Sequence, residues 1–480
     1  MMVNVEVLTG PPGSGKSTQM MQEVADNPGR YLWAAPIIDL IDEQVPRLRE
    51  MAVNADVLAL HSQAKIKGGV SRNIADLAQD YIDDRHVGAF ITHEGLLSAD
   101  AASFEGWHVR IDETPNAVSS GILQIQHSVD LFKANYRLEP MAGSEWSLVV
   151  PIDRSKNWSH LKQDDFAKSL ANFHTLASGS RGVIIDLKEW EEARGRSGVE
   201  WLSIWTPAAL SACASVTLTG AGYFKSLAYR VTEAAFSDQV HHTRTPAQNS
   251  VRTGQPRVRI HYFTHAHRGT TTLWGKSTGR ACLVPVCDWL VGNLPELGYW
   301  SGNDVVQILF EHRVPGQMVK PKLAGLNSLR DYRSCAFIYS SKAVAADKPL
   351  KHVFNLTDAD ILAARETEDI IQFVFRGAIR NPAYDGPYDI YLYHLDQAES
   401  VEKAMIDYGF FNVEVVAIPD SPIMEMKVAR AAPEATLDVA AKWETKKAQQ
   451  RDRSQRYRDK KPKRERTRRR IAKSAAGLEC

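Results

Sequence analysis

The chain has 480 residues, of which 44% are hydrophobic and 24% are charged, and its formal net charge is +1. These values are ordinary for globular proteins and allow two or three domains. No apolar run approaches the length that spans a membrane, and the first residues lack the pattern of a signal peptide. The five cysteines are scattered and lack the paired spacing of a zinc site, which favours a reducing cytoplasm. We therefore expect a cytoplasmic protein, and the lack of long apolar runs predicts no membrane segment.

The first 120 residues alternate strand-like and helix-like segments with short connections. Alternating apolar residues and short apolar runs predict strands over 3–8, 31–35, 56–60, 88–92 and 107–111. Helices are expected between them, over 16–27, 37–52 and 71–85. This alternation is typical of an α/β fold in which a parallel sheet is covered on both faces.

A phosphate-binding loop follows the first expected strand. It reads Gly10, Pro11, Pro12, Gly13, Ser14, Gly15, Lys16, Ser17 and Thr18, the pattern G-x-x-x-x-G-K-[ST] with a helix after it. In such a loop, backbone N–H groups and the start of the helix surround a polyphosphate. Lys16 would reach the β- and γ-phosphates, and the Ser17 hydroxyl would coordinate Mg²⁺. The loop therefore predicts a nucleoside triphosphate site, with ATP and Mg²⁺ as the expected ligands.

Two carboxylates end the strand expected over 107–111. Asp112 and Glu113 would emerge at the carboxyl edge of the sheet, where the phosphate-binding loop also emerges. We expect Asp112 to hold Mg²⁺ together with Ser17, and Glu113 to orient and deprotonate the attacking water. The two motifs together predict hydrolysis of the nucleotide.

The regular alternation breaks over residues 117–200, which we interpret as an insertion. Five of the eleven tryptophans fall there or just beyond, at Trp146, Trp158, Trp190, Trp201 and Trp205. They could stack on nucleic-acid bases, but a tryptophan in an insertion more often packs in the insertion's own core, and we expect packing. A strand is then predicted over 216–219, and the composition of residues 239–256 is that of a linker.

A second alternating region begins at residue 257. It predicts strands over 257–263, 281–286, 305–310, 334–340 and 388–394, with helical stretches near 358–381 and 396–408. We therefore expect two α/β domains, 1–240 and 257–430.

The net charge conceals a basic C-terminal stretch. Residues 442–473 contain sixteen Lys and Arg against four Asp and Glu, with few apolar residues. Such a segment cannot bury a core, so we expect a basic, disordered tail over 431–480. It could aid solubility, bind an acidic partner protein, or hold a nucleic-acid backbone by counterion release, and we favour the last.

In content and order the motifs resemble those of the superfamily 2 helicases and translocases, the DEAD/DEAH-like family. Gly10–Thr18 resembles motif I of that family, Asp112–Pro115 resembles motif II, and Thr217–Ala221 resembles motif III. The resemblance implies two RecA-like P-loop domains with parallel sheets. The first would carry the inserted subdomain, and the basic tail would follow the second.

The resemblance also implies further site residues. The family's motifs that contact the nucleic-acid backbone correspond here to Ala35, Pro36, Thr92, His93, Gly325 and Asn327. Motif VI corresponds to Gln372–Arg380, so Gln372, Arg376 and Arg380 join Glu113 as expected catalytic residues. In the family an arginine of this motif reaches the γ-phosphate. Arg376 stands at the usual offset from Gln372, and Arg380 follows one residue later than usual, so either could serve.

Three departures from the family pattern bear on these expectations. Only nine residues precede Gly10, which leaves no room for the motif that reads adenine, so specificity for ATP is an assumption. Motif II continues with Thr114 and Pro115, which excludes the strict DEAD-box subgroup. About a hundred residues separate Glu113 from Thr217, which again indicates an inserted subdomain.

These observations predict an ATP-dependent helicase or translocase that acts on nucleic acid, with DNA favoured over RNA. Three alternatives stay open: a P-loop nucleotide kinase, a duplex translocase or remodeller that does not separate strands, and a clamp that binds ATP without turnover. The size, the insertion and the variant motif VI are similar to those of phage-encoded helicases, which would act in the host cytoplasm.

Overall fold

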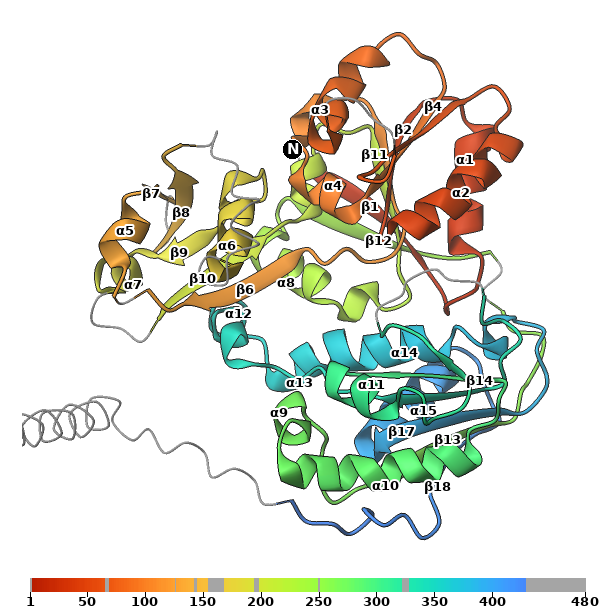
Figure 1. Cartoon of the computed structure of the whole chain (residues 1–480). Helices are drawn as coiled ribbons and strands as arrows, with labels where there is room; N and C mark the ends of the chain where they lie inside the picture. The colour runs from red at the N-terminus through yellow and green to blue at the C-terminus, as the bar shows by residue number, and fades with distance from the viewer. Residues whose placement is uncertain are drawn as a thin grey trace, which may run out of the picture. The chain divides into compact units, whose positions relative to one another are not determined.

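The computed structural model (Figure 1) describes residues 2–64, 69–125, 127–141, 145–153, 168–193, 198–248, 251–321 and 328–428. The described residues up to Met426 form one compact unit. Trp158, Gly325, Asn327 and the predicted basic tail lie outside the described residues. Among the helices that are described, none combines the length and the apolar character needed to cross a bilayer.

The first half is built on a seven-stranded sheet with parallel pairing throughout. Its strand order is β12-β1-β11-β5-β2-β4-β3. The strands are β1 Val3–Thr9, β2 Arg30–Ala35, β3 Asp56–Leu60, β4 Val87–Thr92, β5 His108–Ile111, β11 Ser215–Thr219 and β12 Val240–Pro246. The strands predicted before residue 120 and over 216–219 all occur, because their apolar patterns are those of buried strands.

Helices cover both faces of this sheet (Figure 1). They are α1 Lys16–Asp26, α2 Ile38–Met51, α3 Val70–Asp80, α4 His93–Ser98 and α8 Leu227–Phe236, with 3-10 turns η1 Ala101–Phe104, η4 Pro207–Leu210 and η5 Tyr223–Lys225. Met21 of α1 and Ile41 of α2 pack with Trp33 in one core. Val5 and Val7 of β1 belong to the core on the other face, with side chains of α3, α4 and α8. Burying each such side chain contributes about 1.5–3 kcal/mol.

Between β5 and β11 the chain forms a separate antiparallel sheet. Its strand order is β6-β10-β9-β8-β7. Its elements are β6 Val118–Leu123, α5 Val129–Lys133, β7 Tyr136–Pro140, β8 Trp146–Pro151, α6 Lys168–Ser178, β9 Ile184–Asp186, α7 Leu187–Glu191 and β10 Val199–Ile204. Trp190 and Trp201 lie in the core of this insertion, and Trp205 lies in a core of the first parallel sheet. These three tryptophans pack internally, as expected.

The second half carries a six-stranded sheet that is again parallel. Its strand order is β15-β14-β16-β17-β13-β18. Its strands are β13 Val258–Thr264, β14 Gly298–Gly302, β15 Gln317–Met318, β16 Ser334–Ile338, β17 Tyr388–His394 and β18 Val413–Ala417. Two parallel sheets and an antiparallel insertion confirm the predicted α/β fold of tandem RecA-like domains.

The helical segments of the second half connect these parallel strands. They are α9 Thr271–Trp274, α10 Ser277–Asn293, α11 Asp304–Phe310, η6 Ala345–Asp347, α12 Lys348–Phe354, α13 Asp358–Leu362, the π-helical turn η7 Ala363–Thr367, α14 Glu368–Val374, η8 Ala378–Arg380 and α15 Leu395–Asp407. Because α14 and η8 precede β17, the segment Gln372–Arg380 lies before the amino end of that strand.

Three segments differ from the sequence-based expectations. Residues 281–286 and 305–310 were predicted as strands but lie in helices α10 and α11. Both are short apolar runs, and a buried helix and a buried strand cannot be distinguished from such runs. The linker expected over 239–256 begins instead with β12, an edge strand that pairs with β1 and leaves most of its polar side chains exposed.

Candidate nucleotide-binding site

The phosphate-binding loop leaves the carboxyl end of β1 and leads directly into α1. Gly13 and Gly15 have φ angles of +86° and +79°, a conformation that residues with a Cβ rarely adopt. Lys16 folds back over the loop, and its Nζ donates to the carbonyl oxygens of Gly10 at 2.9 Å and Pro11 at 2.8 Å. The loop therefore holds a cationic group above its own backbone.

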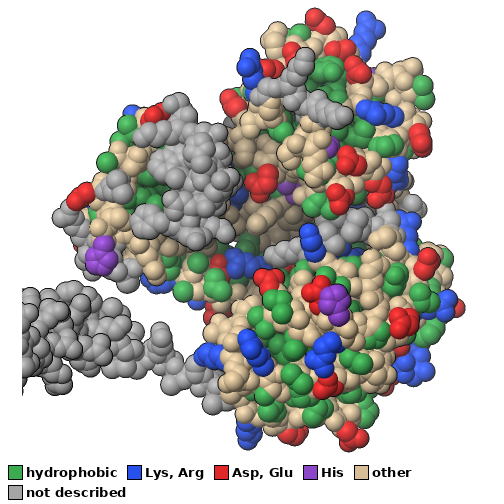
Figure 2. All heavy atoms as spheres, viewed as in Figure 1, with side chains coloured by type: hydrophobic (Ala, Val, Ile, Leu, Met, Phe, Trp, Pro, Cys, Tyr) green, Lys and Arg blue, Asp and Glu red, His purple; other side chains and the backbone are tan. Residues whose placement is uncertain are grey.

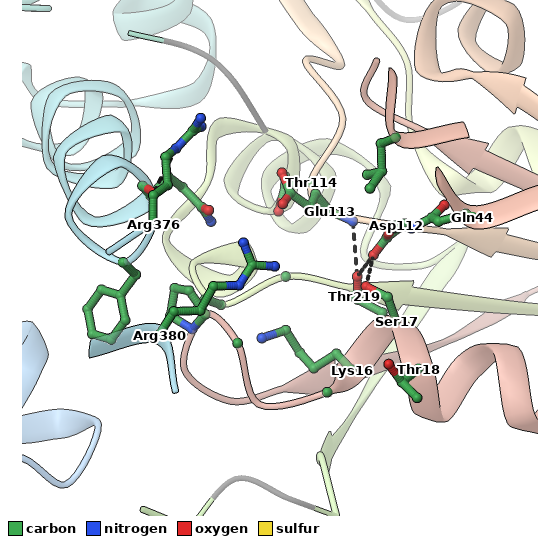
Figure 3. A pocket seen from close by; sticks show the side chains of 18 of the residues that line it. Lys16, Ser17, Thr18, Gln44, Asp112, Glu113, Thr114, Thr219, Arg376 and Arg380 are labelled. Carbon is green, nitrogen blue, oxygen red and sulfur yellow. Dashed lines mark hydrogen bonds between the residues drawn. The ribbon is translucent and has the colours of Figure 1, made fainter. Parts of the chain in front are cut away.

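The carboxylate of Asp112 is the centre of a hydrogen-bond network beside this loop (Figure 3). Its Oδ1 accepts from Ser17 Oγ at 2.6 Å and from Thr219 Oγ1 at 2.8 Å, and its Oδ2 accepts from Gln44 Nε2 at 2.5 Å. Asp112 follows β5, and Thr219 ends β11, the strand between β5 and β1. Asp112 is only 2% exposed, so three donors offset the desolvation of its charge.

Two buried side chains, Trp33 and His93, support this network through further hydrogen bonds. Trp33 Nε1 donates to Gln44 Oε1 at 3.0 Å, which directs the amide nitrogen of Gln44 to Asp112. The ring of His93 lies 2.9 Å from the backbone carbonyl oxygen of Asp112. Burial lowers the pKa of His93 to about 4, so the ring is neutral at physiological pH and donates through Nε2–H to that carbonyl.

Glu113 occupies an unusual backbone conformation for a residue with a side chain. Its φ is 66°, in the left-handed region, and its N–H donates to Thr219 Oγ1 at 3.0 Å. One hydroxyl therefore contacts both acidic residues of the motif. Burial, followed by the neighbouring charge of Asp112, raises the pKa of Glu113 to about 7. A carboxylate with that pKa is suited to accept a proton near neutrality.

Arg380 approaches the phosphate-binding loop from the second half. Its backbone carbonyl oxygen and Cγ lie so close to Gly13 that a Cβ on that glycine would come within 2.5 and 2.6 Å of them. Figure 3 shows its guanidinium group reaching toward Glu113 and Lys16. Burial lowers the pKa of Lys16 to about 8, and the positive charge of Arg380 acts in the same direction.

Arg376 lies in the same cavity but is oriented differently. Its guanidinium group points away from Lys16 in Figure 3, and its Nε donates to Gln372 O at 3.3 Å. The residue is 4% exposed, and within the described part of the chain its buried Nη1 has no hydrogen-bond partner. Burial lowers the pKa of this guanidinium. A buried N–H without an acceptor is costly, and a bound anion would satisfy it.

These groups line one cavity of about 700 Å³ to which both halves contribute. That volume lies in the usual range for small-molecule and cofactor sites. The first half supplies the loop, part of α2, Asp112–Thr114 and Thr219–Ala221. The second half supplies Arg330, Gln372, Phe375 and the two arginines, with Glu368 and Asp369.

The cavity brings together most of the residues expected at the nucleotide. The lining includes Pro12, Gly13, Gly15, Lys16, Ser17, Thr18, Asp112, Glu113, Gln372, Arg376 and Arg380. Gly10 and Pro11 border a neighbouring cavity instead, and Ser14 is buried.

Several residues that line the site, among them Gln44, Thr219, Arg330 and Glu368, were not expected to have a catalytic or binding role. Thr219 lies within Thr217–Ala221, the segment that resembles motif III, so its sequence position could have indicated a role, and Gln44 lies on α2. Arg330 and Glu368 carried no signal, because only the fold brings them to the cavity. Glu368 lies against the backbone of Gly222, and its Oε1 accepts from Gln372 Nε2 at 3.0 Å.

Four described residues that were expected to contact nucleic acid, Ala35, Pro36, Thr92 and His93, do not line this cavity. Ala35 is fully buried at the end of β2, and Thr92 Oγ1 caps α4 by accepting from Gly95 N at 3.2 Å. His93 is 7% exposed and supports Asp112, so its ring is engaged within the fold. Pro36 is partly buried after β2. A nucleic-acid contact at these positions stays a prediction. The backbone groups of these residues could make such a contact while their side chains keep the internal contacts described above.

Comparison with known proteins adds structural matches only. No family model matches the chain, and no curated protein matches it. S. tokodaii Xpd4 is 9% identical to this chain in sequence. Its structure matches with a TM-score of 0.43, and the match covers 86% of this chain and 96% of that chain. S. cerevisiae Dbp5 bound to RNA and ADP BeF3 is 10% identical, with a TM-score of 0.37 over 87% and 85%. RecG bound to a three-way DNA junction is 10% identical, with a TM-score of 0.33 over 84% and 42%.

The matches give no support to a phage origin. The chain has the two-sheet architecture of tandem RecA-like domains.

Proposed function

We propose that the chain is a nucleic-acid-stimulated ATP hydrolase that works as a helicase or translocase. The observation that carries this proposal is a single cavity in which Lys16, Asp112 and Glu113 of the first half meet Arg376 and Arg380 of the second. Because the cavity is complete only when both halves contribute, hydrolysis can be coupled to their relative movement.

The first half would bind the triphosphate and its metal. The loop N–H groups and Lys16 hold the phosphates, and Ser17 and Asp112 would hold Mg²⁺. Their donor set fits this ion, because a hydroxyl and a carboxylate oxygen lie 2.6 Å apart and Mg²⁺ prefers hard oxygen ligands. Bound there, Mg²⁺ would neutralise charge on the β- and γ-phosphates. Thr219 and Gln44 support this role by fixing the Asp112 carboxylate.

Glu113 would act as the general base for the attacking water. Its raised pKa lets it accept the water proton near neutral pH, and Thr219 fixes its backbone through the 3.0 Å hydrogen bond. The same threonine contacts Asp112 at 2.8 Å, so the base and the metal-binding carboxylate keep a fixed relative position. Such fixed geometry is a large part of catalysis in phosphoryl transfer.

Arg380 is our candidate for the residue that stabilises the charge on the γ-phosphate. The packing of its backbone against Gly13 and the direction of its guanidinium toward Lys16 both favour Arg380 over Arg376. An arginine in this role contributes about 10³–10⁵-fold to the rate. Burial raises the pKa of Glu113, and the positive charges of Arg376 and Arg380 oppose that rise. Arg376 would therefore help to keep the general base ionised.

Coupling to nucleic acid rests on the motif resemblance and on charge. Figure 2 shows Lys and Arg side chains interspersed with Asp and Glu on the face that it draws. In contrast, residues 442–473 concentrate sixteen basic residues, and we infer that this segment supplies part of the attraction to the phosphate backbone. DNA is the favoured nucleic acid.

The test is ATP turnover with and without single-stranded and duplex DNA and RNA. We expect nucleic acid to stimulate turnover by the wild-type protein and Lys16→Ala to abolish it. Lys188→Ala, at an exposed position on α7, is the matched control and should have no effect. Near-normal turnover by Lys16→Ala would refute the site assignment, and transfer of the phosphoryl group to a nucleotide would favour a kinase. Strand displacement on tailed duplexes then separates a helicase from a duplex translocase.

A further inference from the structure

The segment that joins the two halves is bonded to the loop that carries Arg380. Arg252 donates from Nη1 to Ile379 O at 2.9 Å and from Nη2 to Asn381 O at 3.1 Å. These two carbonyl groups belong to the residues immediately before and after Arg380. The backbone N–H groups of Thr253 and Gly254 donate to Pro382 O at 3.1 and 2.9 Å.

The earlier part of the same segment is bonded to the phosphate-binding half. Ala247 N donates to Thr9 O at 2.8 Å, directly before the first glycine of the loop. Gln248 N donates to Gln19 Oε1 at 3.0 Å, on α1. Residues of one short segment therefore contact both the strand that leads into the phosphate-binding loop and the loop that carries Arg380.

Arg252 is suited to a fixed position rather than to a flexible surface role. Its guanidinium carbon lies 4.1 Å from the centre of the Phe410 ring, and burial lowers its pKa to about 10. A planar guanidinium that stacks on a ring and donates two N–H groups holds its acceptors in a defined orientation. Lysine has the charge but cannot reproduce this pair of bonds.

We propose that Arg252 is a positioning residue for Arg380, which it holds in place through the carbonyl groups on either side of it. This inference rests on the proposed ATP hydrolysis at the cavity. Arg252 does not line that cavity but borders the neighbouring one, so we expect its effect on the reaction to pass through Arg380. Misplacement of a catalytic group by about 1 Å can cost on the order of 10²-fold in rate.

The experiment compares Arg252→Ala and Arg252→Lys with the wild-type protein, each alone and combined with Arg380→Ala. We expect Arg252→Ala to lower kcat for ATP by on the order of 10²-fold per folded molecule, with KM and nucleotide affinity unchanged. Arg252→Lys should recover little of that loss. In the Arg380→Ala background the cost of Arg252→Ala should disappear, because the group that it positions is gone. Arg257→Ala, at an exposed position on the same segment, is the control.

Three results would overturn the inference: an unchanged kcat in Arg252→Ala, full recovery by Arg252→Lys, or a cost that adds to that of Arg380→Ala. Thermal unfolding of each variant corrects the rates for the folded fraction, and a loss explained by unfolding alone also counts against positioning. Failure of the proposed function would look different, because Lys16→Ala and Arg380→Ala would then retain normal turnover themselves.

Discussion

Arg380 packs its backbone carbonyl against Gly13, so the arginine of one half and the phosphate-binding loop of the other are in direct contact. A Cβ at Gly13 would lie 2.5 Å from that carbonyl oxygen, and the glycine also has a φ of +86°. The contact requires the absence of a side chain at this point in the loop. Through this contact, the backbone of Arg380 packs directly on the phosphate-binding loop.

Gly13→Ala should therefore impair hydrolysis by displacing Arg380. Gly69→Ala is a control for the positive φ, because Gly69 also has a φ of +86° and, among the described residues, no atom lies within 4 Å of the position of a Cβ. A Cβ at a positive φ should destabilise both variants, but only Gly13→Ala should slow ATP turnover. Equal turnover by the two variants would contradict the contact between Gly13 and Arg380 as a functional feature.

Thr219→Val should weaken Mg²⁺-dependent activity. The change removes the hydroxyl that contacts the Asp112 carboxylate and the Glu113 N–H while preserving shape. Loss of a residue that orients a metal ligand typically costs about 10–100-fold in metal affinity. A titration of activity with Mg²⁺ measures the shift. Thr217→Val, at a buried position on the same strand, is the control, and an unchanged Mg²⁺ requirement in Thr219→Val would count against the network.

The pH dependence of turnover should have two limbs close together. Glu113 can accept a proton only when it is ionised, so kcat/KM should rise with pH through about 7, the pKa to which burial raises it. Lys16 binds phosphate only when protonated, so kcat/KM should fall as pH rises through about 8. The alkaline limb should also appear in nucleotide affinity, and the acid limb should appear in kcat. A profile that is flat across this range would contradict both assignments.

Trp201→Ala should destabilise the insertion without weakening nucleic-acid binding. Trp201 is 6% exposed, its ring packs against Gly121, and it meets Phe173 edge to face at 5.8 Å. Removing a buried tryptophan costs about 3–5 kcal/mol. Chemical unfolding and single-strand affinity, measured where the variant is folded, separate the two roles. Weaker binding with unchanged stability would instead indicate base stacking.

Much of the first half could be predicted because its signals are local. The strand that leads to Gly10 and the strand that ends before Asp112 have apolar patterns of buried strands, and the loop between β1 and α1 has a fixed spacing. The ambiguous cases were segments 281–286 and 305–310, where short apolar runs fit a buried helix and a buried strand equally well. Residues 298–302, which form β14, contain two glycines and gave no strand signal.

The parts of the site that could not be predicted depend on contacts between distant residues. Nothing local marks Arg252, because its acceptors at Ile379 and Asn381 lie more than a hundred residues later. Sequence spacing likewise left Arg376 and Arg380 as equal candidates. The approach of Arg380 to Gly13 and the direction of its guanidinium in Figure 3 distinguish them.

The most direct test of a nucleotide site shared by both halves is single-turnover ATP hydrolysis by Arg380→Ala, with nucleotide affinity measured in parallel. We expect the rate of hydrolysis to fall by about 10³–10⁵-fold while the protein still binds ATP, because the first half supplies the binding groups and the second supplies the charge that speeds the reaction. Arg376→Ala should bind ATP as well and lose less of the rate. Hydrolysis by Arg380→Ala at close to the wild-type rate would contradict the account.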